Sequence, residues 1–324
     1  MQLLGPEFSG SVVQISGGES GPLGRFVAVR KQVRAFDGDI VHPYLEECCV
    51  FVSLASLGKS SPKVVWGVRN SGILPMDYPL KIRMINKVAK WLAPLPHMVV
   101  FNSEAGRRSY SGVKSQHLTV IPNGIDSERF RPAKNLTEAL EVRKRFGIPP
   151  HVPVIAFVGR DDPMKGIEDF IKIARILLDQ HRDCHIVIVG LESGSIPADL
   201  LQSERVSVLG RVEYPEEIMM VCDVLVSTSR YGEGFPNVIG EAISSGCRVI
   251  ATDVGDCRSV VGTSGFVFAP GQIDAMTTAI IRELETPISN DERWEANLKI
   301  KNQFGLETLV RRSEDVFLQI ASGK

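Results

Sequence analysis

From residue 154 onward the chain alternates short apolar runs with helical stretches, and this alternation restricts its fold more than any other feature. The apolar runs are VIAFVG (154–159), HIVIVG (185–190), VSVLG (206–210), VLVST (224–228) and RVIAT (248–252). The stretch between the first two, residues 167–180, carries apolar residues at helical spacing. Strands that are apolar on both faces and separated by helices pair in parallel and are covered on both sides. We therefore predict a doubly wound α/β domain.

The first part of the chain shows the same pattern less completely. Its candidate strands lie at 11–16, 39–42, 63–68, 97–103 and 117–124, and its candidate helices at 24–36, 44–57, 79–92 and 104–110. Residues 131–153 hold four prolines and one short helical segment, which is typical of a connection between domains. We predict an N-terminal Rossmann-like domain over 1–134, a C-terminal domain over 135–310, and a helix over 311–324 that packs towards the N-terminal domain.

Charge is divided unevenly between the two predicted domains. Residues 1–134 hold 17 Lys and Arg against 10 Asp and Glu, whereas the rest of the chain holds 20 against 28. A basic first half could face nucleic acid, anionic lipid or an anionic substrate. No run of about 18 apolar residues and no signal-peptide pattern is present, so a cytoplasmic protein is expected. The six cysteines form no CxxC pair, and we expect buried free thiols.

Two glutamates, Glu233 and Glu241, bracket the sequence GFPN. Glu233 falls in a loop after the strand at 224–228, and Glu241 falls in a helix that begins near Pro236 and stops at Gly246. Ligands bind at the carboxyl ends of parallel strands, and a helix start offers N–H groups to an anion. Two carboxylates this far apart suit two hydroxyl-bearing rings joined by an anionic group. This is the chemistry of a nucleotide sugar.

A second strand-loop-helix junction reads FVGRDDPMKG (157–166) and places Arg160 and Lys165 at the same edge of the sheet. Two cations beside a helix start suit a diphosphate, because charge-assisted hydrogen bonds are strong. The plainer interpretation is that both are solvated loop residues.

Together these segments resemble the retaining glycosyltransferases of family 4. The resemblance rests on FVGRDDPMKG, on EGFPNVIGEAISSGCRVIATDVG (233–255), and on NSEAGRRSY (102–110) followed by VIPNGIDSERFRP (120–132), and it covers roughly residues 39–324. It implies the GT-B fold, in which two Rossmann-like doubly wound domains face each other across a cleft. The E-x7-E element in its EGFPN…EA setting is the most specific part of the match.

The resemblance also implies roles for individual residues. Arg160 and Lys165 would hold the donor diphosphate and stabilise it as it departs, and Glu233 would contact the sugar hydroxyls, so these three form the expected catalytic group. Glu241 would bind the ribose, and Arg211 would lie beside the base. The sugar and phosphate pocket would be lined by Gly234, Phe235, Pro236 and Asn237.

The chain departs from the family pattern in two places. The family's D-x-V-H element, here Asp39–His42, stands unusually near the start, so the N-terminal domain is expected to be incomplete. Residues 11–16 are then either the family's first strand or, as we favour, a later one. Arg69 stands where many members have a histidine; it either touches donor or acceptor or is a structural arginine at a strand end. His42 is interpreted as a packed, hydrogen-bonded histidine.

The predicted helix at 79–92 is amphipathic. Met84, Ile85, Val88, Trp91 and Leu92 fall on one side and Arg83, Lys87 and Lys90 on the other. Such a helix is either ordinary domain surface or an interfacial helix on a membrane. With the basic balance of its domain, we favour peripheral contact with an anionic membrane at its cytoplasmic face.

The resemblance implies a hexosyltransferase that moves a sugar, with retention of configuration, from a UDP-sugar or GDP-sugar to a lipid-linked or saccharide acceptor in polysaccharide biosynthesis. No metal, other cofactor or nucleic acid partner is expected. Two alternatives stay open: the donor-binding subunit of a split or inactive transferase, and a GT-B nucleotide-sugar epimerase.

Overall fold

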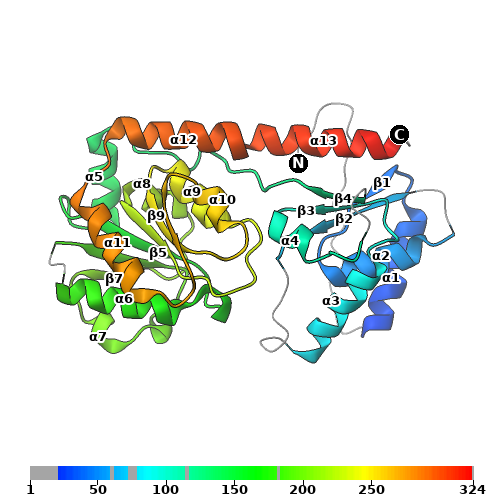
Figure 1. The fold of residues 1–324 in the computed structure, drawn as a ribbon, viewed down its shortest axis with the longest axis horizontal. Coiled ribbons are helices and arrows are strands. Elements are labelled where there is room, and N and C mark those ends of the chain that lie inside the picture. The colour runs from blue at the N-terminus through cyan, green and yellow to red at the C-terminus, as the bar shows by residue number, and fades with distance from the viewer. Residues whose placement is uncertain (1–20, 59–61, 72–78, 114–116, 181–182, 323–324) are drawn as a thin grey trace. The chain divides into compact units, whose positions relative to one another are not determined.

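The computed structural model describes residues 21–58, 62–71, 79–113, 117–180 and 183–322. It divides into two compact units, each built on its own sheet (Figure 1). Unit 1 comprises Met1–Pro122 and Glu307–Lys324, and unit 2 comprises Asn123–Leu306. The strand predicted at 11–16 lies outside the described residues.

Within the described residues, unit 2 contains a six-stranded parallel sheet of order β10-β9-β8-β5-β6-β7. The strands are β5 (Val154–Val158), β6 (His185–Val189), β7 (Val206–Val208), β8 (Val224–Ser227), β9 (Arg248–Thr252) and β10 (Gly265–Phe268). All five predicted strands form, and the edge strand β10 was not predicted. The chain builds outward from β5 to β7, then returns to β8 on the other side of β5. The sheet therefore has a topological switch point between β5 and β8.

Helices cover both faces of this sheet (Figure 1). One face is covered by α6 (Ile167–Gln180), α7 (Ala198–Leu201) and α11 (Ile273–Glu285). The other is covered by α5 (Leu136–Arg145), α8 (Pro215–Val221), α9 (Asn237–Ser244), α10 (Cys257–Val261) and α12 (Asn290–Phe304). Because the central strands are buried on both sides, they have the continuous apolar sequences from which they were predicted.

Unit 1 contains, among its described residues, a four-stranded parallel sheet of order β1-β2-β3-β4. The strands are β1 (Ile40–Val41), β2 (Lys63–Val68), β3 (Met98–Phe101) and β4 (Leu118–Val120). The helices are α1 (Pro22–Ala35), α2 (Glu46–Ser56), α3 (Leu80–Leu92), α4 (Glu104–Arg108) and the C-terminal α13 (Leu306–Ser322). Trp66 of β2 lies in the core formed with α1, α2 and α3, and its indole nitrogen donates to the Ser53 hydroxyl at 2.8 Å.

Two expectations from the sequence are confirmed by side-chain positions in these units. All six cysteines are free thiols, five of them buried and Cys48 half-buried. The Nδ1 atom of His42 lies 2.6 Å from the Val65 carbonyl oxygen, and its ring packs against Phe317 of α13 at 5.4 Å between centroids. His42 is thus packed and hydrogen-bonded. Burial, the largest cause, lowers the pKa of His42 below its usual value.

No helix in the described part of the chain is both long enough and apolar enough to cross a membrane.

The segment 123–134 was predicted in the N-terminal domain but lies in unit 2. The Ile125 amide donates to the Phe304 carbonyl at 2.7 Å. The side-chain amide of Asn297, which is buried in α12, donates to the carbonyl oxygens of Ser127, Phe130 and Ser244 at 2.8–3.1 Å. One buried side chain therefore attaches this segment to α9 and α12.

Replacing Asn297 by Ala should lower the melting temperature of the protein. The change leaves buried carbonyl oxygens without their donor, which costs about 1–3 kcal/mol. Thermal unfolding followed by circular dichroism checks this, with Gln303→Ala on the exposed side of the same helix as the matched control. Equal melting temperatures for the two variants would show that Asn297 does not hold the segment.

Candidate donor-binding site

The loop after β5 and the loop after β8 are bound to each other at the switch point. The Thr228 hydroxyl is 3.1 Å from the Lys165 carbonyl oxygen and 2.9 Å from that of Gly166, and the Arg230 amide donates to Met164 O at 2.8 Å. Gly166 has φ +63°, and a β-carbon there would meet Thr228 O at 2.2 Å. Only glycine permits this close approach. The sequence KG at 165–166 thus places Lys165 directly beside the loop that carries Glu233.

Lys165 and Glu233 form an ion pair at this junction. The Lys165 ammonium donates to Glu233 Oε1 at 2.6 Å, and the buried Ser229 hydroxyl donates to the same oxygen at 2.7 Å. The side chains of Lys165 and Glu233 are only 18% and 9% exposed. A charge-assisted hydrogen bond in so little water is stronger than a surface pair. The two residues assigned to diphosphate and sugar are therefore partners of each other in this structure.

Glu241 lies in α9 and has a different environment. Among the described residues its carboxylate has no hydrogen-bond or ion-pair partner. Burial raises the pKa of Glu241 to about 7, while the positive charges of Arg129 and Lys165 oppose the shift and the negative charge of Glu216 adds to it. Arg129 is itself paired with Glu216 at 2.9 Å. Glu241 is thus a carboxyl group without a bonded partner near the cation of the site.

The segment between the two glutamates presents backbone to the site. The Phe235 side chain is buried and packs against Phe304 with 5.1 Å between ring centroids, so only its backbone is available to a ligand. Gly234 O accepts from the Asp256 amide at 3.1 Å. Pro236 precedes the first residue of α9, Asn237, whose side-chain oxygen accepts from Asn123 Nδ2 at 2.7 Å.

Within the described residues, Arg160 and Arg211 make no hydrogen bond or ion pair with Lys165, Glu233 or Glu241. The Arg160 side chain is 80% exposed and pairs with Asp162 at 3.4 Å. Arg211 is exposed and makes no ion pair within the described residues. Arg69 belongs to unit 1, where its guanidinium lies 4.7 Å from the centre of the Tyr44 ring.

Three residues of the cluster were not predicted from the sequence: Ser229, Arg129 and Glu216. Ser229 is the second residue after strand β8, so its position near a strand end was a usable signal. Arg129 stands within VIPNGIDSERFRP, which was quoted for the resemblance without a role for the arginine. Glu216 follows the start of α8 and carries no local signal that connects it with Glu241.

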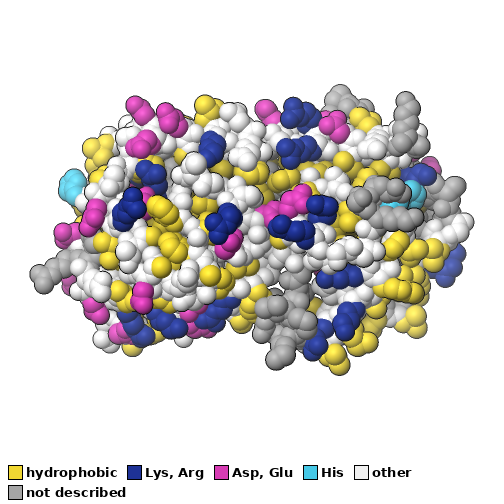
Figure 2. Space-filling model, viewed as in Figure 1, with side chains coloured by type: hydrophobic (Ala, Val, Ile, Leu, Met, Phe, Trp, Pro, Cys, Tyr) yellow, Lys and Arg dark blue, Asp and Glu magenta, His cyan; other side chains and the backbone are white. Residues whose placement is uncertain are grey.

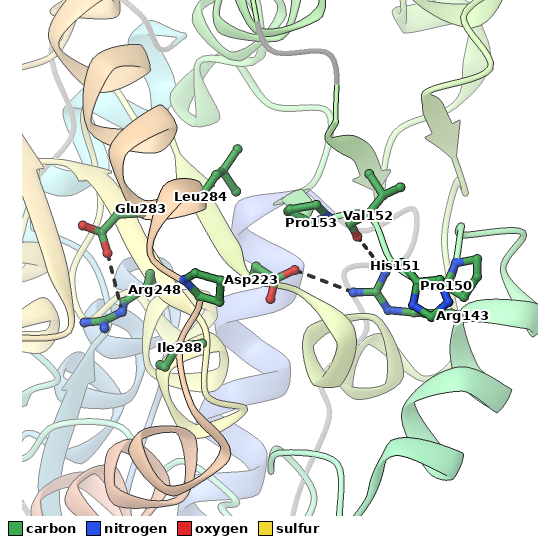
Figure 3. A pocket seen from close by; sticks show the side chains of 11 residues that line it. Arg143, Pro150, His151, Val152, Pro153, Asp223, Arg248, Glu283, Leu284 and Ile288 are labelled. Carbon is green, nitrogen blue, oxygen red and sulfur yellow. Dashed lines mark hydrogen bonds and ion pairs between the residues drawn. The ribbon is translucent and has the colours of Figure 1, made fainter.

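A cavity of about 230 Å³ lies at the opposite edge of the sheet, near the amino ends of β5, β8 and β9 (Figure 3). Its charged groups already have partners. Arg143 donates to the carbonyl oxygens of Pro149 and Val152, both at 2.8 Å, and Asp223 accepts from the Val154 amide at 2.8 Å. These bonds hold the start of β5, so we assign the cavity a structural role.

Replacing Glu241 by Gln should stabilise the protein at pH 8 and have little effect at pH 5. The pKa of Glu241 is about 7 in the folded chain against an ordinary value of 4.5, so the folded state binds the proton more tightly. The stability that protonation contributes is lost as pH rises through about 7. The gain at pH 8 should be on the order of 2 kcal/mol.

Denaturant titrations at both pH values measure this gain in the free energy of unfolding, with exposed Glu295→Gln as control. An equal effect of Glu241→Gln at both pH values would contradict the shift.

Two family models match the chain. Residues 5–129 match the model described as Glycosyltransferase Family 4, and residues 152–286 match the model described as Glycosyl transferases group 1. A D-inositol 3-phosphate glycosyltransferase of Nocardia farcinica is 31% identical over 218 residues, which cover 62% of this chain and 47% of that protein. An Escherichia coli UDP-Gal:alpha-D-GlcNAc-diphosphoundecaprenol alpha-1,3-galactosyltransferase is 28% identical over 224 residues, covering 65% and 57%. The matches thus span about half the length of these relatives.

Solved structures show the same fold. The complex of Anabaena HepE with UDP superposes with a TM-score of 0.74 at 20% identity, covering 91% of this chain and 82% of that one. Sucrose-phosphate synthase of Thermosynechococcus elongatus gives a TM-score of 0.77 at 21% identity, covering 93% and 79%. The chain has two α/β units, each built on a sheet of parallel strands, and its fold is GT-B. The two family models agree with the motifs around Lys165, Glu233 and Glu241, and the chain belongs to the group 1, family 4 glycosyltransferases.

Proposed function

We propose that this protein transfers a sugar from a nucleotide-sugar donor to an acceptor hydroxyl with retention of configuration. The observation that carries the proposal is the convergence of Lys165, Glu233 and Glu241 at the switch point of the unit 2 sheet, beside the start of α9. Ligands of open α/β sheets bind at this place. The cluster offers a cation, two carboxylates and helix N–H groups, which match a diphosphate flanked by two hydroxyl-bearing rings.

Each group has a defined part in this proposal. Lys165 binds the diphosphate and stabilises the negative charge that grows on it as the sugar departs. Glu233 accepts hydrogen bonds from the sugar hydroxyls, and Glu241 binds the ribose. Arg160, which is exposed in the loop after β5, is proposed to bind the diphosphate together with Lys165. Arg211 beside the base, Arg69 on the acceptor side, and the lining by Gly234, Phe235, Pro236 and Asn237 belong to the same proposal.

The relatives support the choice of donor and acceptor classes. Structures of HepE contain UDP and UDP-glucose, and a Corynebacterium glutamicum relative, 29% identical over 207 residues, is described as a GDP-mannose-dependent mannosyltransferase acting on a phosphatidylinositol mannoside. The Escherichia coli relative is named for a diphosphoundecaprenol acceptor. We propose a UDP-sugar or GDP-sugar donor, a lipid-linked or saccharide acceptor, and a reaction that requires no metal or other cofactor.

The direct test incubates the purified protein with a panel of UDP-sugars and GDP-sugars and a membrane extract. Mass spectrometry identifies the product, and the coupling constant of its anomeric proton reports the configuration. Transfer should persist in excess chelator. Nucleotide binding without transfer or donor hydrolysis would favour a donor-binding subunit, and interconversion of two nucleotide sugars would favour an epimerase.

Replacing Lys165 by Ala should weaken the binding of UDP or GDP by at least about 1.5 kcal/mol, the lower end for a hydrogen bond to a charged group. Isothermal titration calorimetry measures this. The matched control is Lys172→Ala in α6, which removes an ammonium that is 60% exposed and paired with Asp169. If both variants bind the nucleotide as the unchanged protein does, Lys165 does not contact the diphosphate.

We also propose that unit 1 contacts an anionic membrane through α3. Met84, Val88 and Trp91 form an apolar stripe along this helix. Their exposed fractions are 57%, 41% and 79%, so the stripe is not buried in the core of unit 1. At 3.6 residues per turn the exposed Lys81 and Lys87 fall on either side of the stripe. Figure 2 shows hydrophobic and basic side chains together where Figure 1 places α1 to α3. This arrangement is typical of an interfacial helix.

The unchanged protein should sediment with vesicles that contain anionic lipid and much less with neutral vesicles. Binding should decrease but persist at high salt, since only the ionic part is screened. Lys81→Glu with Lys87→Glu should weaken binding strongly at low salt, because each basic residue contributes about 1 kcal/mol near an anionic surface and the new carboxylates are repelled by it. Arg311→Glu with Arg312→Glu in α13 is the control of equal charge change. Equal losses in both variants would assign the attraction to net charge and not to α3.

A further inference from the structure

The Lys165–Glu233 ion pair joins two residues that are proposed to bind different parts of the donor. In the unliganded structure the lysine proposed to bind the diphosphate is bonded to the glutamate proposed to bind the sugar. With their side chains 18% and 9% exposed, neither charge has enough water around it to do without a partner. Any ligand that takes Lys165 must therefore replace the Glu233 carboxylate with an anion of its own.

We propose that Lys165 and Glu233 form a latch that the donor diphosphate opens. This inference rests on the proposed function. The diphosphate takes the Lys165 ammonium, and the Glu233 carboxylate is released to accept hydrogen bonds from the sugar. The free-state carboxylate thus occupies the bonding position of a phosphate oxygen. A ligand without phosphate groups, such as a free sugar or a nucleoside, has no negative charge to pair with the Lys165 ammonium. Such a ligand therefore leaves the latch closed.

The structure also explains why Glu233 stays in place when the latch opens. The Ser229 hydroxyl donates to the same Oε1 atom at 2.7 Å, so this oxygen keeps one donor after Lys165 has left. The Ser229 carbonyl oxygen in turn accepts from the Thr252 hydroxyl of β9. A carboxylate held by one buried hydroxyl retains its orientation, and its second oxygen is available to a sugar hydroxyl.

A double-mutant cycle on nucleotide binding tests the latch, with UDP and GDP titrated into the 324-residue protein. Glu233→Gln should tighten binding of the accepted nucleoside diphosphate about tenfold or more, because the ligand no longer competes with a charge-assisted hydrogen bond. The gain should be clearly smaller when Lys165 is replaced by Met, since only the repulsion between Glu233 and the diphosphate is then removed. Asp199→Asn, which breaks an exposed ion pair of 2.7 Å with Arg175, should change nothing.

The cycle separates failure of the latch from failure of the proposed function. An equal gain from Glu233→Gln with and without Lys165 would mean that Glu233 acts by repulsion alone, and the latch would be wrong. If the unchanged protein bound neither UDP nor GDP, the proposed function would be contradicted and the latch with it.

A structure of the unchanged protein with the bound nucleoside diphosphate provides a second measurement that does not depend on the folding of any variant. It should show the Lys165 ammonium bonded to a phosphate oxygen and beyond hydrogen-bonding distance from Glu233 Oε1. Persistence of the bond near its present length of 2.6 Å in the complex would overturn the latch.

Discussion

The order of the parallel strands in unit 2 is the constraint on which the donor site depends. Because β5 pairs with β6 on one side and with β8 on the other, the chain reverses its direction of growth at β5. The loops that follow β5 and β8 therefore leave the same edge of the sheet as neighbours. Thr228 and the left-handed Gly166 then bind the two loops together. This junction brings Lys165 and Glu233 together.

The two glutamates of the E-x7-E element differ in their bonding: Glu233 has a cationic partner and Glu241 has none among the described residues. Glu233 is compensated by an ammonium and a hydroxyl, so its burial is stable without a ligand. Glu241 lacks a bonded partner in the described structure, and burial raises its pKa to about 7. A hydroxyl-rich ligand would supply the donors that Glu241 lacks, whereas it must first displace the partner of Glu233. Of the two carboxylates, Glu233 is therefore already bonded within the protein, and Glu241 is available to a ligand.

Unit 1 presents a different kind of surface. Its sheet is short, and α1, α2 and α3 pack on the side of β2 that carries Val64, Trp66 and Val68. Ala89 of α3 is buried in this contact, while Trp91 two residues later is 79% exposed. The half-buried Leu92 also packs on this core, so α3 contacts its own domain through Ala89 and Leu92 while Met84, Val88 and Trp91 are exposed.

The sequence by itself determined five strands of unit 2, the covering of its sheet by helices on both faces, and the segments after β5 and β8 in which Lys165 and Glu233 lie. Local sequence patterns predict these features, because a strand that is buried on both faces must be apolar throughout. The edge strand β10 is only partly buried and was not predicted, although its sequence GFVF is also apolar throughout.

Only the tertiary structure decided which residues meet. Lys165 and Glu233 are 68 positions apart and become partners because β8 returns to lie beside β5. The segment 123–134 joins unit 2 through Asn297, which lies more than 160 positions further along the chain. The outward direction of the α3 stripe depends on which few residues the neighbouring helix covers. Each of these outcomes depends on strand order and helix packing over long sequence separations, and local patterns do not encode them.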